Sequence, residues 1–163
     1  MMAGAAVAQD KTTLATDKEK VSYAIGLDVA RSFQPIAQDV DFGAMQRALD
    51  MTVAYSKERV QFGRPIGSFQ ALKHRMAEMF ALVETARSAS YAATDSLAAA
   101  DAAVAKVYCS EAFSHVAAES IQMHGGIAIT WEHDAQLYFK RAHGSSQLFG
   151  SPATYVRRFA QSA

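Results

Sequence analysis

Apolar residues recur with the spacing of an α-helix along most of this chain, and this spacing constrains the fold more than any other feature. The longest stripe would form one face of a helix: Leu72, Met76, Met79, Phe80 and Val83. No segment alternates with a period of two for long enough to form a pair of strands. Only three prolines occur in 163 residues, so few positions interrupt a helix. The sequence therefore predicts an all-α fold, an antiparallel bundle of five to six helices.

Two helices are predicted in the first 60 residues. Thr16 and Glu19 have the spacing of a capping box, in which each side chain bonds a free backbone N–H. The stripe behind them repeats every four residues and ends before Pro35: Val21, Ile25, Val29 and Phe33. Asp41 can cap a second helix running to about Val60, with an apolar face of Phe42, Met45, Leu49 and Val53.

Glycines and a proline divide the remaining helical pattern. The helix that carries the long stripe should begin at Ser68 and end in a turn near residues 96–101, where Asp101 can cap the next helix. That helix should end at Gly125-Gly126, with these side chains inward: Val104, Val107, Tyr108, Phe113, Val116 and Ile121. Residues 127–131 are expected to be extended or irregular. We then expect a helix from Glu132 to His143 with Leu137 and Tyr138 inward, a loop between Gly144 and Gly150, and a last helix starting at Pro152.

Composition and residue spacing argue against several classes of function. Lys and Arg number 16 and so do Asp and Glu, so the net charge of zero gives no support for nucleic acid or an anionic membrane as partner. No apolar run approaches the ~18 residues that span a bilayer. The single cysteine, Cys109, excludes an internal disulfide and is expected to be a buried structural thiol. No two of the five histidines have the i,i+3 or i,i+4 spacing of a helical metal site, so no metal site is predicted.

Two glycine-containing segments carry side chains that could hold a flat, phosphate-bearing cofactor: Arg59-Val-Gln-Phe-Gly-Arg-Pro-Ile-Gly-Ser-Phe-Gln70 and Gln122-Met-His-Gly-Gly126. An arginine can hold a pyrophosphate through paired N–H donors, and Phe62 could lie against a ring system. The alternative is structural. Arg59 then favours the negative end of a helix dipole, Gly63 and Gly125-Gly126 end helices, and Phe62 packs. Physical chemistry alone favours the structural interpretation.

These segments also carry a family resemblance, together with residues 48–75, 117–134, 137–142 and 148–152. From about Met45 to Phe159 the chain resembles the C-terminal helical domain of the acyl-CoA dehydrogenases. The resemblance implies that Arg59, Gln61 and Phe62 meet the pyrophosphate and ring edge of FAD. It also implies that Gln70, Gln122, Gly125 and Gly126 meet the adenosine half, in a flavin held mainly by a neighbouring subunit.

The same resemblance assigns no catalytic residue. The family's usual proton-abstracting glutamate precedes the last helix, and Phe149, which cannot accept a proton, stands at that place. Other members keep the base on the first helix of this domain, whose front half differs here. Glu132 is a carboxylate near the second segment, and we interpret it as a charge at a helix N-terminus. Whether the chain is an enzyme stays open.

The N-terminal part resembles a different family. Residues 14–33, with Asp39-Val-Asp-Phe42 after them, are similar to the dimerisation segment of the secreted FKBP-type prolyl isomerases. The two resemblances meet within residues 43–50, so the chain is interpreted as a fusion of natural or engineered origin. The predicted organisation is a disordered arm over 1–13, an isomerase-like helical segment over 14–43, and a dehydrogenase-like four-helix bundle over 44–163.

The expected function follows from what 163 residues can hold. The family's N-terminal helical domain and middle β-domain do not fit, so we expect a partial FAD half-site without turnover on its own. The helix faces should form a homo-oligomer, most simply a dimer. Two alternatives are a purely structural helical oligomer with no ligand and a subunit completed by a partner chain that carries the missing domains. We expect a cytoplasmic location, although the signal-like Ala6-Val-Ala8 keeps the periplasm as an alternative.

Overall fold

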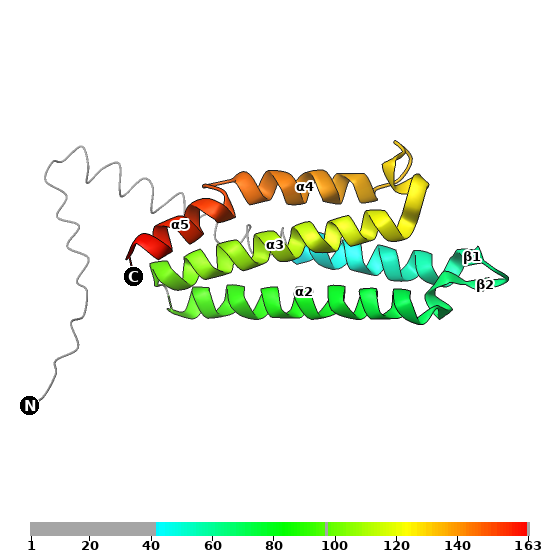
Figure 1. The fold of residues 1–163 in the computed structure, drawn as a ribbon, viewed down its shortest axis with the longest axis horizontal. Helices are drawn as coiled ribbons and strands as arrows, with labels where there is room; N and C mark the ends of the chain where they lie inside the picture. The colour runs from blue at the N-terminus through cyan, green and yellow to red at the C-terminus, as the bar shows by residue number, and fades with distance from the viewer. Residues whose placement is uncertain (1–41, 97, 163) are drawn as a thin grey trace, which may run out of the picture. The chain divides into compact units, whose positions relative to one another are not determined.

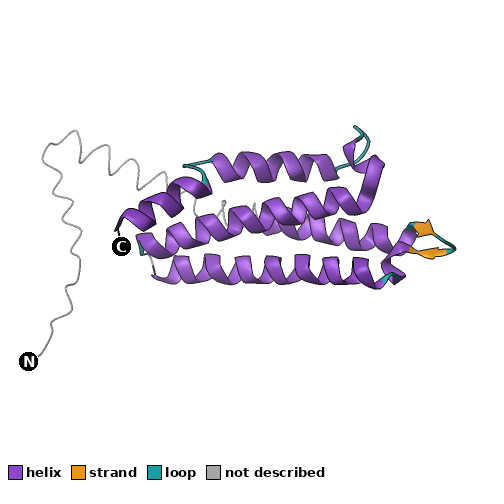
Figure 2. Cartoon of the chain, viewed as in Figure 1, coloured by secondary structure: helices purple, strands orange, loops and turns teal. Residues whose placement is uncertain are grey.

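The computed structural model describes residues 42–96 and 98–162, and most of them are helical (Figure 1). The elements, in chain order, are a helix over residues 42–58, β1 (Val60–Gln61), β2 (Arg64–Pro65), η1 (Ile66–Ser68), α2 (Gln70–Ser96), α3 (Ala99–His124), η2 (Gly125–Ile129), α4 (Ala135–Gln147) and α5 (Pro152–Ser162). The predicted all-α bundle is confirmed. Figure 2 shows the β1–β2 hairpin as the only strands in the described part of the chain.

The core lies where helix 42–58, α2 and α3 meet, and α4 and α5 pack on α3. Its large buried apolar side chains include Met45, Leu49, Met79, Val83, Phe113, Val116 and Met123. Two polar contacts tie the same helices together. The Thr52 and Ser120 hydroxyl groups share a hydrogen bond of 2.8 Å inside the core. Arg75 on α2 pairs with both carboxylate oxygens of Glu119 on α3, at 2.6 and 3.0 Å.

Three side chains predicted to face inward are exposed instead: Phe80 (54%), Val104 (56%) and Leu137 (55%). Each follows or precedes a side chain that does pack inward: Met79, Ala105 and Tyr138 respectively. Successive residues on a helix point about 100° apart, so only one of two adjacent apolar residues can lie at the centre of the buried face. The sequence-based prediction therefore counted residues at the edge of each buried helix face as if they lay at its centre.

Several boundaries also differ from expectation. Helix 42–58 ends before Val60, because Val60 and Gln61 pair with Pro65 and Arg64 in a hairpin that the sequence did not predict. The helix expected over 132–143 begins at Ala135 and continues through Gly144 to Gln147, so the loop predicted to start at Gly144 is wrong. Buried Ala142 and Ser146 keep this last stretch of α4 packed despite the glycine. Ala98 occupies the N-cap of α3, and Asp101 lies in its first turn.

Other boundaries are confirmed. Gly125 ends α3 with a φ of 66°, and α5 begins at Pro152. Cys109 is half-buried rather than buried, and its Sγ lies 3.4 Å from the carbonyl oxygen of Ala86.

The remaining N-terminal predictions lie outside the described residues. They are the disordered arm over 1–13, the capping box at Thr16, the stripe from Val21 to Phe33, the stop at Pro35 and the cap at Asp41. Within the described ranges, no helix is both long and apolar enough to cross a membrane.

Candidate functional site

The first candidate segment forms a tight hairpin that projects from one end of the bundle (Figure 1). Its two turn residues, Phe62 and Gly63, both have positive φ angles, 54° and 76°, as the commonest two-residue hairpin turn requires. A left-handed backbone strains a bulky residue, yet the Phe62 side chain is 92% exposed and touches little except the edge of Phe69. Strain without a packing benefit is typical of functional positions.

The base of the hairpin is held tightly against helix 42–58. The backbone N–H of Arg59 donates to the carbonyl of Tyr55 at 2.9 Å, and the N–H of Ile66 donates to the carbonyl of Arg59 at 2.8 Å. Gly67 lies so close to the last turn of the helix that a Cβ there would be 2.8 Å from Ser56 Oγ. The backbone at Arg59 and Gln61 is therefore fixed by the fold, while their side chains are exposed.

The second candidate segment is the end of α3. The N–H of Gly125 donates to the Ile121 carbonyl and closes the helix. A Cβ built on Gly125 or on Gly126 would meet no atom within 4 Å, so open space borders both glycines. Gln122, one turn earlier, is also exposed. This arrangement leaves the backbone open to close approach by a ligand.

A cluster of three aromatic rings joins the two segments. The Tyr55 hydroxyl lies 3.4 Å from the carbonyl oxygen of His124, and the two rings lie 4.5 Å apart. The ring of His133 lies 4.5 Å from that of His124 and 6.5 Å from that of Tyr55. We call these residues, Tyr55, His124 and His133, the ring cluster. Since Arg59 follows Tyr55 by one helical turn and Gly125 follows His124 directly, the cluster brings both segments to one end of the bundle.

The structure thus places all seven residues predicted to contact a cofactor on exposed positions of these segments or at the start of α2: Arg59, Gln61, Phe62, Gln70, Gln122, Gly125 and Gly126. Their individual contacts with a cofactor stay predictions. The ring cluster was missed by sequence analysis, which examined histidine spacing only within single helices. His124 and His133 are nine residues apart in the sequence. The chain turns between them at Gly125, which has a positive φ angle.

His124 is the most electrostatically perturbed group in this region. Its side chain is 4% exposed, and Nδ1 donates to the Ser120 carbonyl at 2.7 Å. Nε2 is buried and has no hydrogen-bond partner among the described residues. Burial lowers the pKa of His124 below its ordinary value, and the neighbouring His133 lowers it further, while the hydrogen bond to Ser120 acts in the opposite direction.

The loop before α5 offers no proton acceptor at the position where the resemblance places the family's base. Phe149 has a φ of 61° and its ring is 91% exposed, while its carbonyl accepts a hydrogen bond from the Tyr155 hydroxyl at 2.9 Å. Glu132 is also exposed, in the link before α4. In the described part of the chain no group of three His, Cys, Asp or Glu side chains could hold a metal ion.

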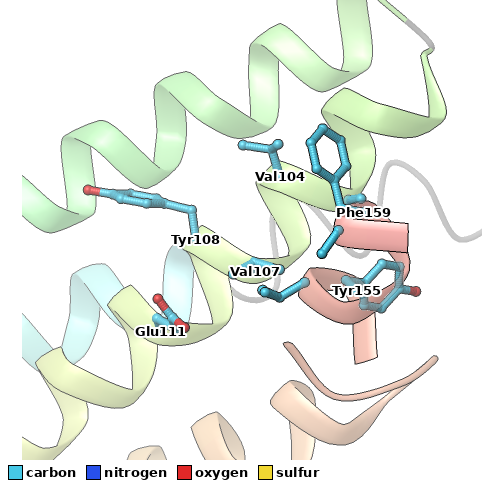
Figure 3. Close-up of a pocket in the computed structure, with 9 residues that line it drawn as sticks. Val104, Val107, Tyr108, Glu111, Tyr155 and Phe159 are labelled. Atoms are coloured by element: carbon cyan, nitrogen blue, oxygen red, sulfur yellow. The ribbon is translucent and has the colours of Figure 1, made fainter. Parts of the chain in front are cut away.

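An apolar pocket of about 390 Å³ lies at the other end of the bundle, between α3 and α5. Figure 3 shows Val104 and Val107 of α3 facing Tyr155 and Phe159 of α5 across it. Glu111 is the only carboxylate in its lining. Among the described residues, this lining holds no arginine or lysine for a phosphate, and the pocket is separate from the hairpin end.

Comparison with known proteins identifies relatives of this arrangement. Residues 40–163 match the family model described as acyl-CoA dehydrogenase, C-terminal domain. The acyl-CoA dehydrogenase IpdE2 of Mycolicibacterium smegmatis is 60% identical over 116 residues, which are 71% of this chain and 37% of the relative. The chain thus spans little more than a third of that protein.

Solved structures give the same result. A chain of the ChsE4-ChsE5 complex from Mycobacterium tuberculosis superposes with a TM-score of 0.68 and 31% identity, over 76% of this chain and 35% of that one. A chain in the FAD complex of PigA superposes with a TM-score of 0.69 and 27% identity, over 77% of this chain and 34% of that one.

Proposed function

Because the chain belongs to the acyl-CoA dehydrogenase family through its C-terminal domain, we propose that the hairpin end of its bundle is a partial binding site for FAD. The observation that carries this proposal is the ring cluster, since the contact of Tyr55 with His124 brings two exposed donor-bearing segments together. A purely structural bundle would need no exposed, strained Phe62 beside two open glycines. The relative solved as an FAD complex supports the choice of cofactor.

The residues present fit one part of FAD. Arg59 would pair with the pyrophosphate, Gln61 would donate beside it, and Phe62 would lie against the edge of the ring system. Gln70, Gln122 and the open backbone of Gly125 and Gly126 would meet the adenosine half. When bound, FAD would supply the capacity to accept electrons from a substrate. This chain's own residues would bind and orient the cofactor.

The rest of the flavin site would come from a neighbouring subunit. Apolar side chains left exposed on η2 and α4 could be covered by such a subunit: Ile129 and Trp131 in and after η2, and Phe139 on α4, which lines a shallow hollow together with Ile129. We propose a homo-oligomer, in its simplest form a dimer. A partner chain that carries the flavin-holding domains is the alternative, which is favoured by the two-protein complex among the solved relatives.

We propose no turnover by this chain alone, because Phe149 stands where a carboxylate base would be needed. The isomerase-like segment over 14–43, and hence the fusion, also remains a proposal. It is supported by the start of the family match at residue 40.

Titration of the purified protein with FAD, followed by flavin fluorescence, tests the half-site. Arg59→Ala should weaken binding roughly 10- to 100-fold, because a charge-assisted hydrogen bond contributes about 1.5–3 kcal/mol. Arg47→Ala is the matched control, since Arg47 is an exposed arginine in the first half of helix 42–58, whereas Arg59 follows the end of that helix. If Arg59→Ala lowers thermal stability but leaves FAD uptake unchanged, the helix-end interpretation is correct. Failure of the wild-type protein to take up FAD would refute the half-site.

A further inference from the structure

The ring cluster connects two segments that are far apart in sequence. On one side, the Tyr55 carbonyl accepts the N–H of Arg59 at 2.9 Å, so any movement of Tyr55 moves the start of the hairpin. On the other side, the Tyr55 hydroxyl contacts the carbonyl of His124, the residue directly before Gly125. The ring of His133 packs against His124 from the link that leads into α4. Three separate parts of the chain therefore meet at the ring of His124.

We propose that the ring cluster is a pH-sensitive clamp that holds the hairpin and the Gly125-Gly126 turn in register, and that acidification releases it. His124 is accordingly a positioning residue, acting on FAD through the backbone of the two segments. What the clamp positions rests on the proposed half-site, while the clamp itself is a property of the cofactor-free protein.

A second proton on either imidazole would meet unfavourable surroundings. His124 Nδ1 carries the proton that it donates to the Ser120 carbonyl, so a second proton would go to Nε2, which is buried without a partner among the described residues. A charge there would lose its hydration without a compensating interaction. His133 Nδ1 accepts the N–H of Ala135 at 3.1 Å at the start of α4. A proton on that nitrogen would turn the acceptor into a donor and break the contact.

The neighbours of His124 offer its cation no compensation. The titratable groups whose rings meet it are Tyr55 from helix 42–58 and His133 from the link before α4. Neither is an anion in this arrangement, and a protonated His133 would repel it. The nearest acidic side chain along α3, Glu119, is paired with Arg75. Glu132 and Asp134 flank His133 in sequence and are exposed to solvent.

The direction of the pH dependence follows from the lowered pKa of His124, whose ordinary value is 6.5. About one pH unit or more above that value, the imidazole is almost entirely neutral in both the clamped and the released protein, so the clamp is fully formed. As the pH falls below 6.5, the released form takes up a proton more readily than the clamped form. Acid therefore favours release.

The experiment follows the amide signals of Gln61, Gly125 and Gly126 by two-dimensional NMR in cofactor-free protein, from about pH 8 to about pH 5. FAD affinity is measured by fluorescence over the same range. We expect the amides of both segments to shift together, with one midpoint below 6.5. FAD binding should weaken by up to about tenfold per pH unit below it, the limit for one proton.

Two variants and a control make the test specific. His124→Phe keeps a ring but cannot titrate, so the shared transition should disappear. His133→Asn keeps an acceptor for the Ala135 N–H and removes the second imidazole, so the midpoint should rise; this variant also serves if His124→Phe fails to fold. His115→Asn changes an exposed histidine on α3 outside the cluster and should leave the transition unchanged.

The outcomes separate the clamp from the half-site. If the amides of Gln61 and Gly125 titrate independently, or if His124→Phe retains the transition, the clamp is refuted whether or not FAD binds. If the amides shift together but FAD binds at no pH, the clamp stands and the half-site is refuted. If FAD binds with the same affinity at every pH while the amides remain unchanged, the half-site stands without the clamp.

Discussion

Replacing Gly67 with alanine should destabilise the protein, because the base of the hairpin leaves no room for a methyl group. A Cβ at this position would lie 2.8 Å from Ser56 Oγ and 2.9 Å from the Ser56 carbonyl oxygen. The hydroxyl belongs to a side chain that can rotate away. The carbonyl belongs to the last turn of helix 42–58, so relief of this second contact requires the backbone itself to move.

The magnitude follows from two opposing effects. Forcing an extra carbon into a packed site costs about 1–3 kcal/mol. Alanine restricts the unfolded chain more than glycine does, which returns about 0.4–1 kcal/mol. The net loss should be about 1–2 kcal/mol, which corresponds to a fall of about 3–8 °C in Tm for a domain of this size.

Circular dichroism during thermal and urea unfolding measures this loss. The double variant Ser56→Ala/Gly67→Ala lacks the hydroxyl contact but keeps the carbonyl contact. Adding Gly67→Ala to Ser56→Ala should therefore still lower the unfolding free energy, but by less than Gly67→Ala lowers it in the wild type. Gly144→Ala is the matched control. Gly144 lies inside α4 with nothing within 4 Å of an added Cβ, and alanine there should stabilise the helix by about 0.5–1 kcal/mol. A Gly67→Ala variant as stable as the wild type would show that the hairpin does not rest on Ser56 as described.

Three further perturbations test other parts of the structure. Met79→Ala should cost about 2–5 kcal/mol of unfolding free energy because Met79 is fully buried. Phe80→Ala, at its half-exposed neighbour, should cost less than about 1 kcal/mol. Equal losses of the two variants in urea titrations would contradict this packing. Phe62→Gly should change unfolding free energy by less than about 1 kcal/mol, since relief of the left-handed backbone offsets the added chain entropy, yet it should weaken FAD binding; a large loss of stability would show that the ring packs. The stability difference between wild type and His124→Phe should be constant above about pH 7.5 and change below the ordinary pKa of 6.5, where wild type loses at most about 1.4 kcal/mol per pH unit through this group; parallel curves would exclude a titrating His124.

The helices were predictable wherever buried residues recur in the sequence with helical periodicity. Met45, Leu49, Met79 and Val83 repeat at helical spacing because they occupy the centres of buried faces. Gly144 misled the prediction because intrinsic preference is weaker than the burial of Ala142 and Ser146 on either side of it. The hairpin was not predictable from periodicity, since strands of two residues are too short to show alternation.

The candidate site also has a part that the sequence predicted and a part that it did not. The seven residues proposed to contact a cofactor were predicted from motif resemblance, and the fold places the two segments that carry most of them at one end of the bundle (Figure 1). The ring cluster could not be read from spacing, because His124 and His133 meet across a turn whose path depends on the positive φ of Gly125. A glycine pair between two histidines was the available signal, but it shows only that the chain turns.

The two exposed phenylalanines on left-handed backbone, Phe62 and Phe149, have an energetic consequence for any molecule that covers them. Their rings stand in water at 92% and 91% exposure, on backbone that the fold has already ordered. Covering each ring would release about 1.5–3 kcal/mol of hydrophobic free energy, and the only new ordering cost falls on two side-chain torsions per ring. Burial of this area would also appear in calorimetry as a heat-capacity decrease of about 0.1–0.2 kcal/mol/K. The free protein thus exposes two phenylalanine rings that a binding molecule could bury, and the calorimetric decrease would show when both rings are buried.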